Sequence, residues 1–387
     1  MAKVIDTLAQ RATGGRRDRR HLTAALAVTG ALLLTACGGT RATPAASPTP
    51  SPRATATAAA SATVTPTATP ASAAPTPTPP ASDLIAYVAV SDGELVPIDV
   101  TTGVAEAPLT VDPAPTSVAI SPDGRYAYVA DGDVATVTPV NLVTGTVGTP
   151  NQVATNAGIT ALAITPSGAT LLAVANPTGY DAGSVVPITL ASGTSGAPIP
   201  VGADPLAIAV TPDGSTAYVV NAGDGTITPI SLASDTAAAP ISVGVDPMAI
   251  TITPSGGTAY VLGGNGVGLL TPVTLAANPA QDVVGNPIAV QTGAPTAIAI
   301  APSGTTAYVT GASGADQLVL PGNAGLGSTS AGDYSTVAIS PDGSTALLGY
   351  GNSSGTAWGV VPVRLATAGP GATIPLHAKP VSIAFRP

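Results

Sequence analysis

Few side chains in this chain of 387 residues could take part in chemistry. Cys37 is the single cysteine, and His377 is the only histidine after His21. So few thiols and imidazoles provide neither a disulfide framework nor a Cys/His metal cluster. The composition disfavours most hydrolases and metalloenzymes, so no catalytic residue and no cofactor are predicted.

The surroundings of Cys37 resemble a lipidated export signal. Basic residues crowd positions 11–21, an apolar run follows over 22–34, and the run ends in Leu34-Thr35-Ala36-Cys37-Gly38-Gly39. The run is too short to cross a bilayer as a helix but suits the core of a signal peptide. Its end is similar to the bacterial lipobox, in which the cysteine thiol takes a diacylglyceryl group and cleavage leaves that cysteine as the N-terminus. The resemblance implies a signal peptide over 1–36 and a lipid anchor at Cys37 on the extracytoplasmic face of the bacterial cell membrane.

Two features of this export signal leave alternatives open. Cys37 could be a chance cysteine behind a signal peptide that is cut elsewhere. Arg19-Arg20 loosely resembles a twin-arginine signal, for which a merely basic leader is the simpler reading.

Residues 37–82 are predicted to be a stalk. After Cys37 this segment is almost only Ala, Thr, Pro and Ser, a composition that cannot bury enough apolar surface to offset the entropy of ordering. If extended at about 3.1 Å per residue, it would reach on the order of 140 Å. It would hold a folded domain clear of the membrane, either as an unmodified spacer or with O-glycosylated Thr/Pro tracts.

The part of the chain that follows the stalk is built from a sequence repeat, and the fold of this repeat must position its polar side chains. From residue 83 onward, an apolar run, a Pro-x-Gly turn and a Tyr/Val-rich run recur seven times. A spacing of about 39 to 48 residues between copies, with short strands, is typical of β-propeller blades. The sequence therefore predicts an all-β domain over 83–387, a seven-bladed β-propeller of four-stranded antiparallel blades.

One copy of the repeat illustrates the four strands, which we call A, B, C and D. They are expected over 205–210, 217–220, 226–230 and 240–243. The A–B connection, Thr211-Pro212-Asp213-Gly214, has the residues of a tight turn. The pairs Ser121/Asp123 and Ser340/Asp342 occupy the same turn position, so a structural role is favoured over catalysis.

Proline recurs inside the predicted C strands. Because proline is confined to sheet edges and bulges, we expect a bulge there or a position that faces away from a hydrogen-bonding neighbour. The prolines are Pro97, Pro139, Pro187, Pro229, Pro272 and Pro362.

The two ends of the domain predict how the ring closes. The domain opens with a B-type strand over 85–90 and ends with an A-type strand over 380–385. Pairing them would complete the seventh blade and remove two open sheet edges.

The repeat resembles the YVTN-type, YncE-like family of seven-bladed propellers. The resemblance rests on Ile120-Ser-Pro-Asp-Gly-Arg-Tyr-Ala-Tyr128-Val-Ala and Val210-Thr-Pro-Asp-Gly-Ser-Thr-Ala-Tyr218-Val-Val-Asn221. It implies the fold and leaves the function open. The chain departs from the family in strand C, which prefers Thr-Pro-Ile, and in the irregular stretch 317–334.

The acidic residues are predicted to gather on one face of the propeller. D–A and B–C loops share a face, and they hold 11 of the 19 acids found from residue 83 onward. We call this the acidic face; it also holds His377, expected to be a solvated loop residue, and Lys379. The acids are Asp112, Asp204, Asp246 and Asp333 in D–A loops, and Asp92, Glu94, Asp131, Asp133, Asp181, Asp224 and Asp316 in B–C loops.

The acidic face is a candidate site for a ligand or cation, through Asp112, Asp131, Asp133, Asp204, Asp224, Asp246 and His377. Asp131-Gly132-Asp133 has a spacing that could present oxygens to Ca²⁺, although the other ligands of a known calcium loop are missing. The alternative is structural, since Asp-Pro and Asp-Gly are ordinary turn residues and acidic surfaces favour solubility.

The acidic character of the propeller domain and the predicted lipid anchor at Cys37 together indicate a class of function. Nineteen acids against four bases from residue 83 onward would repel phosphate backbones, so nucleic acid is not an expected partner. We expect an anchored binding or scaffold module for an envelope or extracellular protein or a cell-wall ligand, and a non-enzymatic role is favoured. The alternatives are a lactonase-like hydrolase, which would need a metal or a His/Glu/Arg set, and a cation-binding role of the acidic face.

Overall fold

The computed structural model describes residues 84–387, apart from 154–156, 178–180, 265, 322–323, 329–331, 352–354 and 368, and gives only the backbone of 324–328. The predicted signal peptide, Cys37 and the stalk lie outside the described residues. No helix among the described residues combines the length and the apolar character that a membrane span requires.

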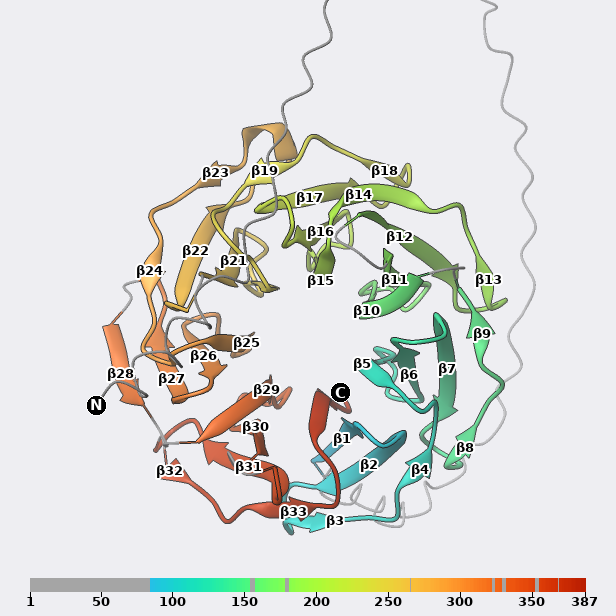
Figure 1. Ribbon diagram of the computed structural model, residues 1–387, viewed down its shortest axis with the longest axis vertical. Helices are drawn as coiled ribbons and strands as arrows, with labels where there is room; N and C mark the ends of the chain where they lie inside the picture. The colour runs from blue at the N-terminus through green and yellow to red at the C-terminus, as the bar shows by residue number, and fades with distance from the viewer. Residues whose placement is uncertain are drawn as a thin grey trace, which may run out of the picture. The chain divides into compact units, whose positions relative to one another are not determined.

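Seven small antiparallel sheets form a ring, as predicted (Figure 1). The A strands lie nearest the axis: β5 (Pro115–Ile120), β10 (Ala157–Ile164), β15 (Pro205–Val210), β20 (Ala249–Ile252), β25 (Pro295–Ile300), β29 (Asp333–Ile339) and β34 (Pro380–Phe385). The B strands follow: β6 (Tyr126–Asp131), β11 (Thr170–Pro177), β16 (Thr216–Asn221), β21 (Thr258–Gly263), β26 (Thr306–Gly311), β30 (Thr345–Gly351) and β1 (Ile85–Val90).

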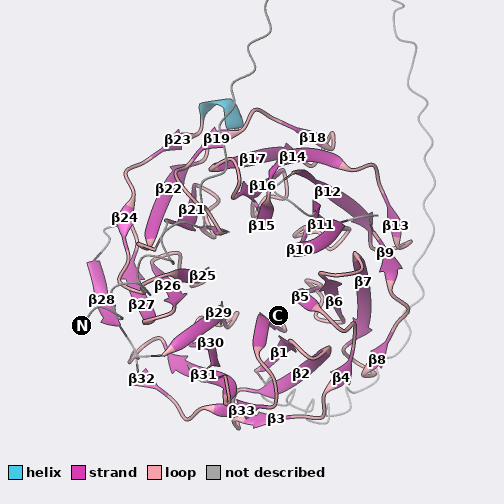
Figure 2. Ribbon diagram, in the orientation of Figure 1, coloured by secondary structure: helices cyan, strands magenta, loops and turns pink. Residues whose placement is uncertain are grey.

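The C and D strands form the outer half of each sheet (Figure 2). The C strands are β7 (Thr136–Asn141), β12 (Ala182–Thr189), β17 (Thr226–Ser231), β22 (Leu269–Thr274), β27 (Gly314–Val319), β31 (Trp358–Arg364) and β2 (Glu94–Asp99). The D segments are β8 (Thr146–Val147) with β9 (Asn151–Gln152), β13 (Thr194–Ser195) with β14 (Ile199–Ala203), β18 (Thr236–Ala237) with β19 (Ile241–Ser242), β23 (Val283–Val284) with β24 (Ile288–Ala289), β28 (Ala324–Ser328), β32 (Gly369–Pro370) with β33 (Ile374–Leu376), and β3 (Val104–Ala105) with β4 (Leu109–Thr110). One 3₁₀ turn, η1 (Pro279–Gln281), precedes β23.

The ring closes through the first and last strands of the domain, as predicted. Strand β34 pairs antiparallel with β1, with Ala86 opposite Phe385 and Val88 opposite Ile383. Beyond the strand, the backbone N–H of Arg386 donates to the carbonyl oxygen of Ile85 (2.9 Å). The closing blade therefore takes its inner strand from the end of the folded domain and its other strands from the start of that domain.

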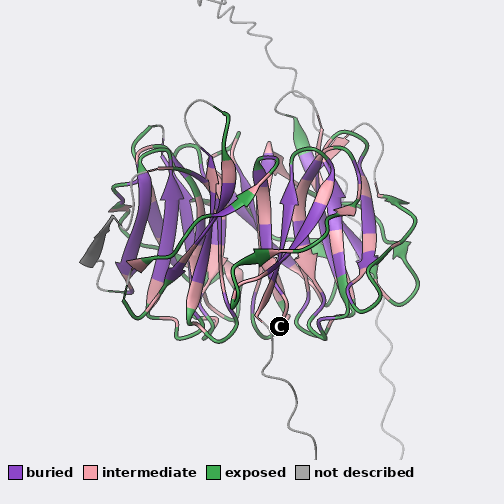
Figure 3. Cartoon of the chain, turned by 90° about the horizontal axis from the view of Figure 1, so that it is seen from below, coloured by how far each residue is buried: buried purple, intermediate pink, exposed green. Residues whose placement is uncertain are grey.

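The core lies between the blades, since each sheet buries both of its faces (Figure 3). On β16, Ala217 and Val219 pack against side chains of the preceding blade, such as Leu172. Tyr218 and Val220 point the other way and pack against the following blade. This two-sided burial explains why the B strands are apolar at successive positions instead of alternating.

The A–B turns have the structural role that the sequence favoured. Gly214 has φ of +70°, and its N–H donates to the carbonyl oxygen of Thr211 (2.8 Å). The Thr211 hydroxyl donates to the Asp213 carboxylate, which also accepts from the N–H of Ser215 (3.0 Å). The same arrangement links Ser121 to Asp123 and Ser340 to Asp342.

The D strand predicted over 240–243 is confirmed as β19, but the D position also holds a second short strand, β18, that the sequence did not predict. The C-strand prolines explain the break between the two. In six blades the D position is split into two short strands, and the C-strand proline lies opposite the break. Proline has no N–H to donate outward, but its carbonyl still accepts one hydrogen bond, as from Gly148 to Pro139 (2.7 Å) and from Gly285 to Pro272 (2.8 Å). The C strand itself carries no bulge at the proline, since it pairs with the B strand in unbroken register. The other alternative is confirmed, because the proline lies opposite the break in the D position, where no N–H is required.

The remaining blade, formed by β25, β26, β27 and β28, confirms that the proline causes the break. Gln317 on β27 occupies the proline position, opposite Tyr308. Here the D position is one continuous strand, β28, which pairs from Asp316 to Val319 with one register shift. The stretch that looked irregular in sequence is thus the blade whose outer strand is unbroken.

Candidate functional site

The loops predicted to share the acidic face are hydrogen bonded to one another. The N–H of Ser91 in the β1–β2 turn donates to the carbonyl oxygen of Lys379 in the β33–β34 loop (2.9 Å). Gly132 donates to Ala114 in the same way (2.9 Å). In these two blades the bonds join the B–C loop to the D–A loop that leads into the same blade.

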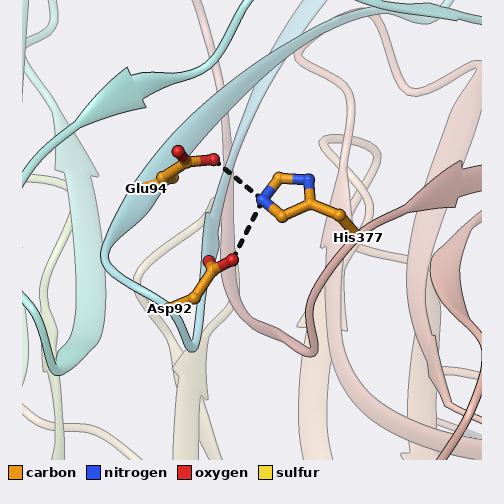
Figure 4. A network of polar contacts seen from close by, with 3 residues as sticks. All are labelled: Asp92, Glu94 and His377. Carbon is orange, nitrogen blue, oxygen red and sulfur yellow. Dashed lines mark ion pairs between the residues drawn. The ribbon is translucent and has the colours of Figure 1, made fainter.

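Three ionisable side chains meet on this face at the closing blade (Figure 4). The Nε2 atom of His377 lies 3.1 Å from Oδ2 of Asp92 and 2.8 Å from Oε2 of Glu94. His377 and Asp92 are about half exposed, at 48% and 45%, while Glu94 is 26% exposed. The cluster is therefore open to solvent on one side and backed by protein on the other.

The backbone fixes the positions of the two carboxylates. Gly93, between them, has φ of +91°, and a β-carbon there would lie 3.0 Å from the carbonyl oxygen of Asp112. Its carbonyl oxygen accepts from the N–H of Val111 (2.8 Å). Only glycine adopts this conformation readily, so it sets the hairpin tightly against the next D–A loop.

The histidine is held from the other end of the chain. His377 follows β33 and precedes the buried Ala378 and the closing strand β34. His377 is an exposed loop residue, as expected, and it is in addition paired with two carboxylates. When its imidazole is protonated, His377 forms an ion pair with both carboxylates. When the imidazole is neutral, Nε2 and the two carboxylates form a set of donor atoms that suits a divalent metal ion.

Asp131 and Asp133 do not form a pair of ligands. Asp131 is fully buried, and Oδ1 accepts from the N–H groups of Asp133 (2.7 Å) and Val134 (2.9 Å). Its Oδ2 accepts from Ala114 (3.1 Å). Both oxygens are thus occupied by the loop backbone, and Asp133 is exposed.

The other acids predicted for the site lie at separate positions, and three of them accept hydrogen bonds from neighbouring loops or strands. Asp112 is buried and accepts from the Thr138 hydroxyl. Asp224 accepts from the N–H of Ala203 (2.7 Å), and Asp204 accepts from the Asn176 side chain (2.7 Å). Asp246 is exposed at a φ of +49°. Within the described residues, only Asp92, Glu94 and His377 bring three potential metal ligands together.

Four of the acids predicted in loops lie in strands. Asp131 is the last residue of β6 and Asp333 is the first residue of β29. Asp316 is inside β27, is buried, and accepts from the N–H of Gln291. Glu94 is the first residue of β2 and pairs with Val90 across the hairpin. In the blades of Asp316 and Glu94, the B–C connection is shorter than the sequence suggested.

The sequence placed Asp92 and Glu94 on the acidic face but did not select them as site residues. The predicted closure of the ring could have identified the cluster from the sequence. Pairing the first strand with the last brings the turn after β1 beside the loop before β34, and hence Asp92 and Glu94 beside His377.

No protein-family model and no curated protein matches the chain. Among solved structures, hydrazine synthase of Kuenenia stuttgartiensis is 18% identical at a TM-score of 0.62, over 71% of this chain and 90% of that one. A functionally unknown protein of Desulfotomaculum acetoxidans is 14% identical at 0.66, over 78% and 98%. A candidate 6-phosphogluconolactonase of Bacteroides uniformis is 17% identical at 0.60, over 79% and 100%. At such low identity these similarities establish the propeller fold alone.

Proposed function

We propose that the protein is an exported lipoprotein whose propeller is a binding module for an envelope or extracellular partner, held off the membrane by the stalk. The lipobox-like sequence at Cys37 supports the anchor, and the all-β ring supplies a rigid platform with loops on each face. The acidic face is the surface we assign to the partner.

The observation that carries this assignment is a set of exposed valines among the acids of that face. Val245 and Val267 are 67% and 62% exposed, and they lie in the D–A and B–C loops of the β20–β24 blade. Gly264 in the second loop donates to the carbonyl oxygen of Val245 (3.1 Å), and the exposed Asp246 is adjacent in sequence. Exposed apolar side chains beside carboxylates suit a partner with apolar and basic groups.

The anchor and the binding surface are tested in cells that express the full chain. Radiolabelled fatty acid should be incorporated into the wild type and not into Cys37→Ser, which should lose membrane retention. Surface crosslinking should recover a partner with wild type, and recover far less of it with the double variant V245S/V267S.

The matched control for the surface is Val143→Ser. Val143 is 65% exposed in a C–D turn, on the opposite face, so its change should leave crosslinking intact. Equal recovery from the double variant and the wild type would refute the acidic face as the docking surface.

A hydrolase of the lactonase type is a second candidate. It is favoured by the approach of His377 to Glu94, since a histidine and a carboxylate beside a possible metal are the groups such chemistry requires. Turnover of sugar lactones that depends on added divalent metal and is lost in His377→Asn would establish it. Absence of turnover under both conditions would exclude this activity.

A further inference from the structure

We propose that Asp92, Glu94 and His377 bind one divalent transition-metal ion, and that this ion fastens the closing blade of the propeller. This inference does not depend on the lipid anchor or on the partner. It concerns three side chains that come from opposite ends of the folded domain.

The distances fit such an ion with little rearrangement. The three ligand atoms lie within 4.8 Å of one another, with Nε2 of His377 3.1 Å and 2.8 Å from the two carboxylate oxygens. Ligands about 2.0–2.2 Å from a tetrahedral Zn²⁺ lie about 3.3 Å apart. Small outward shifts of exposed side chains would therefore admit the metal.

The donor types select the class of metal. One imidazole nitrogen and two carboxylate oxygens suit Zn²⁺ and its first-row neighbours, whereas Ca²⁺ and Mg²⁺ prefer oxygen alone. Three protein ligands on an exposed rim leave a fourth position for water. The side-chain exposures of 48%, 45% and 26% provide that access.

The location of the ligands gives the ion a mechanical role. Asp92 and Glu94 belong to the β1–β2 hairpin, and His377 belongs to the loop that leads into β34. The hairpin and β34 meet in the β1–β34 pairing that closes the ring. Because the three ligands converge only in the folded ring, the ion binds the folded state preferentially and stabilises the closure.

Binding is measured with the full-length protein after treatment with a chelator, by calorimetric titration with ZnCl₂. We expect saturation at about one ion per chain with micromolar affinity. His377→Asn and the double variant D92N/E94Q should each weaken binding by about 100-fold or more. Asp133→Asn, an exposed acid of the same face outside the cluster, should bind as the wild type does.

The fastening role is measured by hydrogen exchange and thermal unfolding. At about 100 times the Kd, Zn²⁺ should raise the Tm by about 5 °C. It should slow amide exchange in β34 more than in β20 on the far side of the ring. Both effects should vanish in His377→Asn and persist in Asp133→Asn.

Each contrary result has a definite meaning. Lack of saturable binding at millimolar Zn²⁺, or equal binding by His377→Asn, would show that the three residues form only an ion pair. Tight binding without slower exchange in β34 would overturn the fastening role. Equally tight binding of Ca²⁺ would overturn the choice of metal.

Discussion

At the scale of single residues, the scarce charged groups mostly hold the backbone of loops and turns. Asp131 accepts three backbone N–H groups, and Asp213 orders an A–B turn together with Thr211. Placing a carboxylate against N–H groups satisfies donors that a short turn cannot pair within a strand. In the described residues, the convergence of His377 with Asp92 and Glu94 differs, because it brings a histidine together with two carboxylates.

Asp213 gives a pH-dependent prediction at this scale. The hydroxyl of Thr211, followed by the N–H of Ser215, lowers the pKa of Asp213 below its ordinary value of 3.8. A lowered pKa in the folded state means stabilisation that is present above pH 4 and lost as the pH falls through the folded-state pKa. Asp213→Asn should therefore cost about 0.5 kcal/mol at pH 7, a small amount because the turn is exposed.

The measurement is urea unfolding of both proteins at pH 7 and at pH 3. The difference between wild type and Asp213→Asn should shrink at pH 3. Asp133→Asn should show no comparable loss at pH 7. A difference that is equal at both pH values would contradict the assignment of the charged carboxylate as the stabilising form.

At the scale of elements, the C-strand proline and the outer-strand glycine act as a pair. A β-carbon on Gly285 would lie 3.0 Å from Cγ of Pro272 and 3.3 Å from its carbonyl oxygen. Gly148, Gly196 and Gly371 face Pro139, Pro187 and Pro362 in the same way. The proline breaks the D strand. The glycine, which has no side chain, lets the backbone pass close to the pyrrolidine ring of the proline at the break.

Gly285→Ala should therefore destabilise the domain by about 1 kcal/mol, because the added methyl group crowds the Pro272 ring. The double variant P272A/G285A should lose less than the sum of the two single changes, by about 0.5 kcal/mol. Urea unfolding of the four proteins gives this coupling energy.

Gly257→Ala is the matched control for the glycine change. A β-carbon there meets nothing closer than the Ser255 hydroxyl at 3.7 Å, so the substitution should be neutral or slightly stabilising. Additive losses in the double variant would show that the proline ring does not set the requirement for glycine.

At the scale of the whole molecule, ring closure is the feature on which the fold and the candidate site both depend. Ile383 and Phe385 of β34 are each 8% exposed and pack into a cluster with Val88 and Val96 from the start of the domain. The Arg386 side chain also donates to the carbonyl oxygen of Gly124 in the next blade (2.9 Å). One short strand thus covers the edge of β1 and supports two neighbouring blades.

Deleting residues 380–387 should abolish the single cooperative unfolding transition. The deletion removes two large buried side chains, each stabilising by about 1.5–3 kcal/mol, and leaves the edge of β1 open. Thermal unfolding followed by circular dichroism should show a broad transition at a lower temperature. Deleting Pro387 alone, an exposed residue beyond β34, should change little, and an unaltered transition after the longer deletion would disprove closure by β34.

The sequence by itself determined the architecture, since blade number, strand order and the pairing of the two ends follow from local patterns. Pro-x-Gly turns and apolar runs specify strands from neighbouring residues, and seven copies leave the first and last strands to complete one blade. The A strand predicted over 205–210 matches β15 to the residue.

Only the tertiary structure decided which polar groups meet. Asp131-Gly132-Asp133 looked like a ligand pair, but the D–A loop occupies Asp131, and that contact is invisible to spacing along the chain. His377 and Asp92 are far apart in sequence, and their distance depends on ring closure and on the loop geometry at Gly93. Local sequence sets backbone conformation, whereas the environment of a side chain is set by segments that fold against it from elsewhere in the chain.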